Sequence, residues 1–448
     1  MAKYQKYAEY QDSGVEWLEQ VPKNWEIIKI KHLSSVKRGA SPRPIDDPKY
    51  FDDNGEYAWV RIADVSASDT YLLNTTQTMS DLGSSLSVKL EPNELFLSIA
   101  GTVGKPCINK IKACIHDGFV YFPDLKIPNK FLFYVFAGEQ AYKGLGKMGT
   151  QLNLNTDTVG DIKVALPKSI EDIQNIINFL DHETAQIDSL IAKQEKLIEL
   201  LKEKRQAVIS HAVTKGLNPD VNMKDSGVEW LGQVPEHWNV LPIKYLTKYV
   251  GTGGTPKNQS SFAEVPEINW FTPGDFSGDL KIVDSSKYVT FSSVEDGDSK
   301  LYEGKSVLMI GIGATLGKVA ISDRDFSCNQ QINVLTCNKL INPEFLTFSL
   351  MSQLEQIKQL SNSSTIGIIN QEKTKQISIT VPSVEEQNKI IHFIMDNIEK
   401  FNTLINKAES AIQLMQERRT ALISSAVTGK IDVRNWQHPN EAKTEFSA

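Results

Sequence analysis

The chain has 448 residues, 40% of them hydrophobic and 23% charged, and a formal net charge of −7 at pH 7. This composition is typical of a globular protein and excludes wholesale disorder, while the length exceeds what one hydrophobic core usually organises. An acidic chain is not typical of nucleic-acid-binding proteins, whose contact domains are usually basic. No apolar run could span a bilayer and no signal peptide is visible, so we expect a cytoplasmic protein without membrane contact.

A repeated motif organises the chain. Residues 12–25 read DSGVEWLEQVPKNW and residues 225–238 read DSGVEWLGQVPEHW, so 11 of 14 positions are identical at an offset of 213. This predicts a tandem repeat. Features that both copies need should recur at that offset, whereas features specific to one target should differ between the copies.

Each copy of the motif introduces a region with the pattern of a mixed α/β, or α+β, globular domain. Strand-like alternation, Gly/Pro turns and short apolar runs predict sheets with insertions in their loops. The two regions match at several points, among them Thr102-Val-Gly-Lys105 with Thr315-Leu-Gly-Lys318. We place the two domains at residues 1–168 and 216–382.

A helical pattern follows each domain, over residues 169–215 and 383–430, and a polar C-terminal tail follows at 431–448. Apolar residues recur every seven positions, with others three or four residues on, which predicts a heptad seam on one long helix. At about 1.5 Å per residue the first helix would be roughly 65 Å long, which exceeds one globular domain and favours pairing of the two helices as a coiled coil. The residues alone leave the orientation of the pair open. The predicted pairing and docking positions are Leu180, Ile187, Ile191, Gln194, Ile198 and Leu201 in the first helix and Ile394, Phe401, Ile405, Ala408, Ile412 and Met415 in the second.

The chain carries no recognisable motif for nucleotide or metal chemistry. Its four cysteines have no CxxC spacing and its seven histidines form no HxH or HExxH group, so neither a disulfide framework nor a zinc site is expected. The glycine-rich segment 311–318 has Ile312 where a phosphate loop needs glycine and Val319 where it needs Ser or Thr. We interpret this segment as a turn shared by both domains.

A loose nuclease-like pattern of Asp124, Asp161 and Lys163 is also rejected. In the second copy Asp161 and Lys163 are replaced by Gln376 and Ser378, so the pattern is not kept where a shared activity would require it. We therefore expect no catalytic residues and no metal, and a protein that positions chemistry done by others.

The order of domain, long helix, domain, long helix, together with the motif of residues 12–25, resembles the specificity subunit of type I restriction-modification enzymes. The helix endings carry the most specific part of the resemblance, with Glu203-Lys-Arg205 against Glu417-Arg-Arg419 and a shared Ala-x-Ile-Ser pattern behind them. Residues Val384-Glu-Glu-Gln387 resemble the motif with which the family begins its helices. The first copy departs from it, because Ile173 stands in place of the glutamine.

The resemblance implies that each domain is a target-recognition domain reading half of a bipartite, asymmetric site in double-stranded DNA. It also implies that the helices pack as an antiparallel coiled coil, which spaces the domains and docks two methyltransferase subunits, with two restriction/translocase subunits completing the complex. S-adenosylmethionine for N6-adenine methylation would belong to the methyltransferase, which must flip its base, and ATP and magnesium to the nuclease partner. This chain would bind no cofactor and would not be catalytic on its own.

Basic and amide residues in predicted loops are the candidate DNA contacts, since Arg or Lys can pair with guanine and Asn or Gln with adenine in the major groove. These candidates are Lys37, Arg38, Arg43, Arg61 and Lys105 in the first domain and Lys257, Asn258, Gln259, Lys318, Asn329, Gln330 and Gln331 in the second.

Two other functions remain open from the residues. A tandem coiled-coil scaffold that joins proteins explains the helices equally well, but gives no reason for two diverged domains with polar loops. A nuclease or methyltransferase with unrecognised motifs would need chemistry that neither copy retains.

Overall fold

A computed structural model describes residues 4–142, 145, 154–361 and 367–439 of the chain, so part of the predicted tail, residues 440–448, lies outside the described residues. The chain forms two compact units. The N-terminal unit comprises residues 1–195 and 410–448, and the C-terminal unit residues 196–409. The boundaries between the units therefore run through both long helices, and each unit contains one globular domain with parts of both helices.

Two sheets and two strand pairs build the domain of the N-terminal unit, which confirms the mixed α/β class. A hairpin of β1 (Tyr10–Asp12) and β2 (Gln20–Pro22) lies inside the repeat motif, and β3 (Glu26–Lys29) pairs antiparallel with β13 (Lys163–Leu166). The five-stranded sheet has the spatial order β4 (Lys37–Arg38), β12 (Phe119–Tyr121), β9 (Leu95–Ser98), β10 (Pro106–Asn109) and β6 (Tyr71–Leu72). The four-stranded sheet has the order β7 (Thr78–Met79), β5 (Tyr57–Val60), β11 (Ala113–Ile115) and β8 (Val88–Leu90).

Short helices connect these strands. They are α1 (Ile30–Leu33), α2 (Ile62–Ala67), α3 (Asp81–Ser85), α4 (Asn129–Ala137) and α5 (Thr156–Asp161), with the 3₁₀ turns η1 (Pro48–Tyr50) and η2 (Gln140–Tyr142). The apolar run of β9 is buried along its whole length, as is β10, because both strands lie inside the larger sheet.

The domain of the C-terminal unit repeats this plan. Its strand pairs are β14 (Met223–Asp225) with β15 (Gln233–Pro235) and β16 (Asn239–Pro242) with β25 (Ser378–Val381). One four-stranded sheet has the order β17 (Thr247–Thr252), β24 (Ile332–Cys337), β21 (Ser306–Ile310) and β22 (Val319–Ser322). The other has the order β18 (Phe262–Ala263), β20 (Tyr288–Val289), β19 (Ile268–Phe271) and β23 (Phe326–Cys328). The helices are α7 (Phe291–Glu295), α8 (Pro343–Ser352), α9 (Leu354–Gln359) and α10 (Gln371–Gln376), with η3 (Ile243–Tyr245), η4 (Gln259–Ser261) and η5 (Pro273–Asp275).

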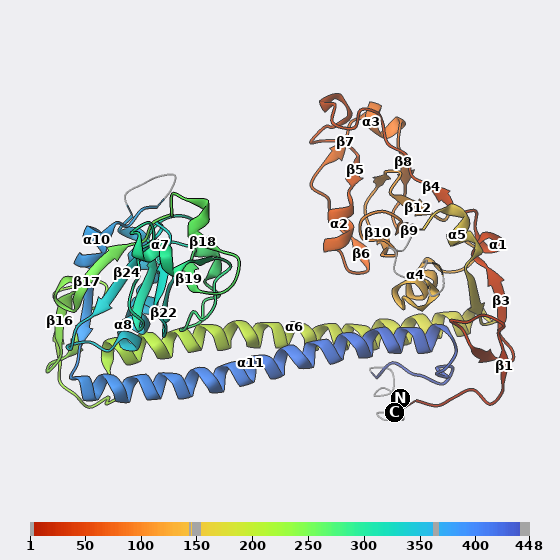
Figure 1. Cartoon of the computed structure of the whole chain (residues 1–448). Coiled ribbons are helices and arrows are strands. Elements are labelled where there is room, and N and C mark those ends of the chain that lie inside the picture. Colours follow the sequence, from red (N-terminus) through yellow and green to blue (C-terminus); the bar gives the residue numbers. More distant parts are fainter. Residues whose placement is uncertain (1–3, 143–144, 146–153, 362–366, 440–448) are drawn as a thin grey trace. The chain divides into compact units, whose positions relative to one another are not determined.

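Two long helices complete the chain, α6 (Ile170–Lys215) of 46 residues and α11 (Val384–Val427) of 44 residues. Neither contains proline, and Ser169 and Ser383 cap their first turns by accepting from the N–H groups of Glu171 and Glu386. In both units α6 and α11 lie side by side and run antiparallel (Figure 1). The predicted helix pair is therefore present, with the orientation that the resemblance implied.

The start of α11 depends on the buried side chain of Gln387. Its amide donates to the carbonyls of Leu340 and Pro382, both at 2.9 Å, and accepts from the N–H of Asn342 at 2.7 Å. In the N-terminal unit Ile173 takes this position and is buried in the apolar core instead. The two copies therefore anchor their helices by different chemistry at the same place.

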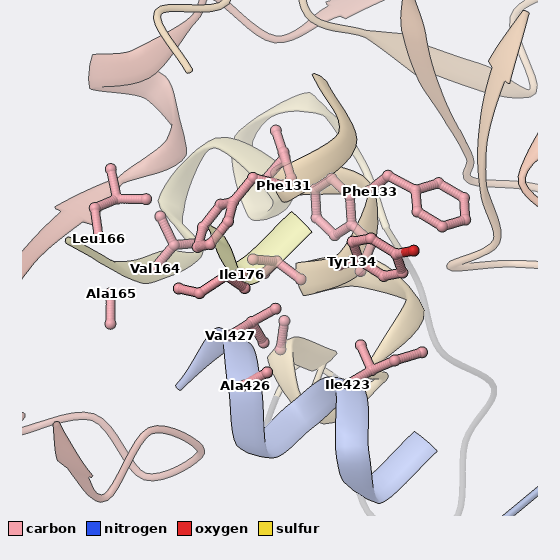
Figure 2. Close-up of a cluster of buried hydrophobic side chains, with 14 of the residues drawn as sticks. Phe131, Phe133, Tyr134, Val164, Ala165, Leu166, Ile176, Ile423, Ala426 and Val427 are labelled. Carbon is pink, nitrogen blue, oxygen red and sulfur yellow. The ribbon is translucent and has the colours of Figure 1, made fainter. Parts of the chain in front are cut away.

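One apolar cluster ties the N-terminal domain to both helices. Figure 2 shows Phe131 and Tyr134 of α4 facing Ile176 of α6 and Ile423, Ala426 and Val427 of α11. The chain after α11 stays in this unit, where Ile431 and Val433 are buried in the same cluster. Among the described residues, no helix combines the length and apolar character that crossing a bilayer requires.

Candidate functional site

The helix pair of the N-terminal unit places the first half of α6 against the second half of α11. The predicted seam residues Leu180 and Ile187 are buried in the core, while Ile191 and Met415 are partly buried and pack against it. Gln194 and Ile412 of this unit are half-buried, as is Leu201 of the C-terminal unit. This is expected for a two-stranded seam that is open to water on its flanks.

A charged contact fixes the pairing of the helices in this unit. Arg419 of α11 donates Nε to Oδ1 of Asp188 on α6 at 2.8 Å and Nη2 to Oδ2 at 3.3 Å. In the C-terminal unit the repeat counterpart, Arg205 of α6, donates Nη1 to Oδ1 of Asn402 on α11 at 2.7 Å. There Ile394, Ile405 and Ala408 are buried, and Ile198 and Phe401 are half-buried.

The end of each long helix packs on the repeat motif of the other copy. Gly429, which follows α11, has φ +70°, and a β carbon there would lie 2.4 Å from Cδ of Pro22 and 3.2 Å from the ring of Trp25. Gly216, which follows α6, has φ +79°, and its β carbon would lie 3.2 Å from the ring of Trp238. The last tryptophan of each motif therefore packs against the end of the helix that belongs to the other repeat.

Large apolar side chains remain exposed on the outer faces of the helices. Leu190, Leu197 and Leu200 of α6 are 49%, 43% and 49% exposed, and Leu404 and Leu414 of α11 are 48% and 64% exposed. These leucines stand beside the seam positions. The apolar surface of each helix therefore extends beyond the face that packs on the other helix.

In the N-terminal domain, two of the predicted DNA contacts, Arg38 and Arg43, bond to one acidic residue, Asp117. Lys37 and Arg38 form the exposed edge strand β4, and Arg38 donates Nε to the carbonyl oxygen of Asp117 at 2.5 Å. The guanidinium of Arg43, 82% exposed, pairs with the Asp117 carboxylate at 3.3 Å. The structure thus brings together residues that lie about 75 positions apart in the sequence.

Arg61 lies in the same region, whereas Lys105 does not. Arg61 lines an open hollow of about 660 Å³ together with Trp59, His116 and Asp117. Its side chain contacts the hydroxyl of Thr76 and forms an ion pair with Asp64 at 3.7 Å. Lys105 donates to the carbonyl of Ser66 at 2.8 Å and lines another hollow, next to the helices.

In the C-terminal domain the predicted loop 257–259 is held by Asp298. This carboxylate accepts from the N–H groups of Lys257 and Asn258 at 3.0 and 3.2 Å, which leaves both side chains exposed. The exposed Gln259 begins the 3₁₀ turn η4. These hydrogen bonds hold the pKa of Asp298 below its ordinary value, with the bond from the Ser261 hydroxyl as the largest cause.

The predicted run 329–331 has mixed exposure. Asn329 is only 7% exposed, and it positions Gln331 by accepting its N–H at 3.0 Å and donating to its side chain at 2.9 Å. Gln330 is exposed, and its amide oxygen accepts from the hydroxyl of Thr255 at 2.6 Å. Direct contact with a ligand is therefore open to Gln330 and Gln331, while Asn329 lies behind them.

The shared Thr-x-Gly-Lys segments close two equivalent hairpins. Gly104, between β9 and β10, has φ +88°, and Gly317, between β21 and β22, has φ +82°, a backbone conformation that favours glycine. The N–H of Lys105 bonds the carbonyl of Thr102, and the N–H of Lys318 bonds that of Thr315. The half-buried Lys318 thus occupies the same turn as Lys105.

Other titratable groups lie in structural surroundings. Asp161 forms ion pairs with Lys29 and Lys31, both at 2.8 Å, and these bonds lower its pKa to about 2. Burial raises the pKa of all four cysteine thiols to about 12. Within the described ranges, no three His, Cys, Asp or Glu side chains gather closely enough to hold a metal ion.

Sequence reasoning missed Gln77, His116 and Asp117, which line the hollow beside Arg61. Asp117 was not predicted, because only basic and amide residues were considered as contacts, yet it bonds to both Arg38 and Arg43. A signal was present, since His116-Asp117 lies at the repeat offset of 213 from the candidates Asn329-Gln330.

Comparison with known proteins gives consistent results. The family described as type I restriction modification DNA specificity domain matches twice, over residues 22–200 and 235–414. The putative type I restriction enzyme MjaX specificity subunit of Methanocaldococcus jannaschii is 22% identical over 436 residues, covering 93% of this chain and 95% of that protein. The type I restriction enzyme EcoBI specificity subunit of Escherichia coli is 23% identical over 308 residues, covering 65% of this chain and 63% of its own length.

Solved structures agree in fold. A chain from a structure of type I R-M complex assembly and conformational transition superimposes with a TM-score of 0.68 at 13% identity, covering 91% of this chain and 98% of that one. The HsdS subunit from Thermoanaerobacter tengcongensis gives a TM-score of 0.51 at 12% identity, covering 92% and 98%. At such identities these likenesses show the fold alone. The two family matches span most of the chain, which therefore belongs to the type I restriction-modification DNA specificity family.

Proposed function

We propose that this protein is the subunit that directs a type I methyltransferase and its nuclease partner to a bipartite, asymmetric DNA site, with one half read by each domain. The observation that carries the proposal is the contrast between the two repeats. The contacts that join the helices and close them on the repeat motifs recur in both units, whereas the loops that carry basic and amide residues differ. A conserved frame with diverged loops is what two unequal half-sites on one spacer require.

The long helices would set the spacing between the half-sites and dock the partners. The exposed leucines on α6 and α11 support docking, because exposed apolar rows on a paired helix are typical of protein interfaces. We expect two methyltransferase and two restriction/translocase subunits. Their surfaces would supply the positive field toward phosphate that a chain of net charge −7 lacks.

The chain itself would be non-catalytic and act in the cytoplasm, where its DNA lies. Thiols with pKa values near 12 are protonated at neutral pH and are poor nucleophiles. S-adenosylmethionine would bind the methyltransferase, and ATP and magnesium the nuclease/translocase. None of these three groups would bind to residues of this chain.

The decisive experiment is methylome sequencing of a host that expresses this chain with its cognate methyltransferase, compared with a host that lacks the chain. We expect a new bipartite motif with N6-methyladenine in both halves. An active methyltransferase and a stable chain without any new motif would refute the DNA-specificity role and favour the protein scaffold.

A domain exchange tests the assignment of one half-site to each domain. Replacing residues 34–167 by the equivalent region of a relative should change one half of the motif and leave the other half and the spacing unchanged. Changes in both halves, or in the spacing, would contradict the modular assignment.

A further inference from the structure

The same backbone frame surrounds the loops of both domains. The N–H of Gly39 bonds the carbonyl of Phe119 at 2.9 Å, and the N–H of Gly253 bonds that of Ile332 at 3.2 Å. Phe119 N–H in turn bonds the carbonyl of His116, as Ile332 N–H bonds that of Asn329. These matched bonds make position 116 equivalent to 329, and position 117 equivalent to 330.

Gly39 and Gly253 each lie against the loop that contains the matched position, His116 or Asn329. A β carbon on Gly39 would be 2.2 Å from the carbonyl oxygen of His116, and one on Gly253 would be 2.3 Å from that of Asn329. The loop of the glycine and the loop of position 116 or 329 therefore approach each other in the same way in both copies. This approach is made by the backbone and does not depend on the side chains.

A second set of matched bonds places two more positions. Arg61 and Thr272 each donate their N–H to an aspartate three residues on, Asp64 at 2.9 Å and Asp275 at 2.7 Å. Position 61 is therefore equivalent to 272.

The adjoining strands match as well. The N–H of Trp59 bonds the carbonyl of Gln77 at 2.9 Å, and the N–H of Trp270 bonds that of Lys287 at 3.0 Å. Position 77 is therefore equivalent to 287.

At each of these positions the backbone is kept while the side chain changes. Arg61 stands against Thr272, Gln77 against Lys287, and Asp117 against Gln330. In the first domain, Arg61, Gln77 and Asp117 converge on one hollow of about 660 Å³, whose walls include Trp59 and His116.

These side chains are accessible. Gln77, Lys287 and Gln330 are exposed, and the side chains of Arg61 and Asp117 are 43% and 44% exposed. A structural role shared by both domains would keep the side chains alike, as it keeps Trp59 and Trp270. Different side chains at these solvent-accessible positions on an unchanged backbone indicate selection for different targets.

We infer that the positions 61/272, 77/287 and 117/330 read base edges of the two half-sites, each trio in its own half. This assignment rests on the proposed function and adds to it the residues that distinguish the halves. Arg61 supplies paired donors suited to guanine, and Gln77 supplies the donor and acceptor suited to adenine. Asp117 supplies an acceptor suited to the amino group of cytosine and also holds Arg38 and Arg43 in place.

The test transplants the second trio into the first domain of the full chain, as Arg61→Thr, Gln77→Lys and Asp117→Gln, expressed with the methyltransferase. We expect the methylome motif to change in its first half only. The mirror variant, Thr272→Arg with Lys287→Gln and Gln330→Asp, should change the second half only. An unchanged motif in either variant, with the wild-type chain producing a bipartite motif, would overturn the inference and leave the proposed function intact.

A matched control uses the exposed ion pair of Glu56 and Lys112 in the same domain. Replacing both by glutamine should leave the whole motif unchanged, because such a pair contributes little to stability. If this control changed the first half as the trio does, the effect would not be specific to the trio and the inference would fail. A motif that is absent with the wild-type chain as well would count against the proposed function itself.

Single variants decide the matter if the triple variant fails to assemble with the methyltransferase. Asp117→Asn keeps the size of the side chain, and Arg61→Lys keeps its positive charge but removes the paired donors. Each variant should lower the preference for the first-half bases by about tenfold or more. The readout is binding of the assembled complex to duplexes with the first half randomised and the second half fixed. Equal preference in wild type and both single variants would overturn the inference.

Discussion

Arg419 of α11 and Asp188 of α6 form a two-point ion pair, with N–O distances of 2.8 and 3.3 Å, and their repeat counterparts Arg205 and Asn402 meet in the other unit at 2.7 Å. Each helix thus donates an arginine near its C-terminal end to the other. The pairing is reciprocal, so each unit holds a helix contact of the same kind. Antiparallel pairing follows, because only then does each helix end meet the middle of its partner.

Breaking this ion pair should destabilise the N-terminal unit by a modest amount. Because the Asp188 side chain is 48% exposed, we expect Arg419→Ala to cost about 1 kcal/mol, and a double-mutant cycle with Asp188→Ala to give a coupling of about 0.5–1 kcal/mol. Urea denaturation of the wild type, the two single variants and the double variant measures this coupling. A coupling of zero would show that the two helices do not depend on this contact.

Alanine at the glycine after α11 should be more damaging than at other glycines with positive φ. Gly14→Ala meets no atom within 4 Å, so it should cost only the backbone strain, about 1 kcal/mol. Gly429→Ala adds a clash with the rigid ring of Pro22 and should cost about 2 kcal/mol or more, and Gly216→Ala should lie between them. Denaturation midpoints give the order. A Gly429→Ala midpoint equal to that of Gly14→Ala would contradict the packing of the helix end on the repeat motif.

Charges on the two faces of α6 should have different effects. Ile191→Asp with Ile198→Asp places carboxylates in the half-buried seam, and should unfold the helix pair or make the chain insoluble. Leu190→Asp with Leu197→Asp places them on the exposed face, and should leave a folded chain that no longer assembles with the methyltransferase.

Circular dichroism and size-exclusion chromatography with the partner separate the two results. Normal assembly of the seam variant, Ile191→Asp with Ile198→Asp, would refute the coiled-coil assignment. Normal assembly of the outer-face variant would move partner docking to another surface.

Acid should weaken the N-terminal domain through His116. Burial lowers the pKa of this imidazole below its ordinary value of 6.5, against a smaller opposing effect of Asp117. The native state therefore binds the proton less readily than the unfolded chain. The stabilisation from the neutral ring is complete above about pH 6.5 and is lost as pH falls below that value.

His116→Asn, which installs the residue of the second copy, provides the comparison. As the pH is lowered from about 7.5 to about 5.5, the wild type should lose more free energy of unfolding than this variant. Urea midpoints at both pH values measure the shift. A difference that does not change with pH would show that His116 does not titrate differently in the folded domain.

Repetition and periodicity made the architecture readable from the chain. The heptad spacing of Leu180 and Ile187 predicted a long paired helix, and both residues are buried in the apolar cluster of the N-terminal unit. The failed phosphate-loop match at Ile312 predicted a turn, and Gly317 closes a hairpin there with positive φ. Such features depend on residues that are neighbours along the chain, so their pattern survives in the sequence.

The orientation of the helices and the convergence of Arg38, Arg43, Arg61 and Asp117 were decided by the tertiary structure alone. Heptads are compatible with parallel and antiparallel pairs, and only contacts such as Arg419 with Asp188 select one. Asn329 looked like a candidate contact, yet it is buried beneath its neighbours. Local patterns thus determined the elements and the duplication, whereas the grouping of distant side chains depends on how strands pair and loops close, which no short stretch of sequence encodes.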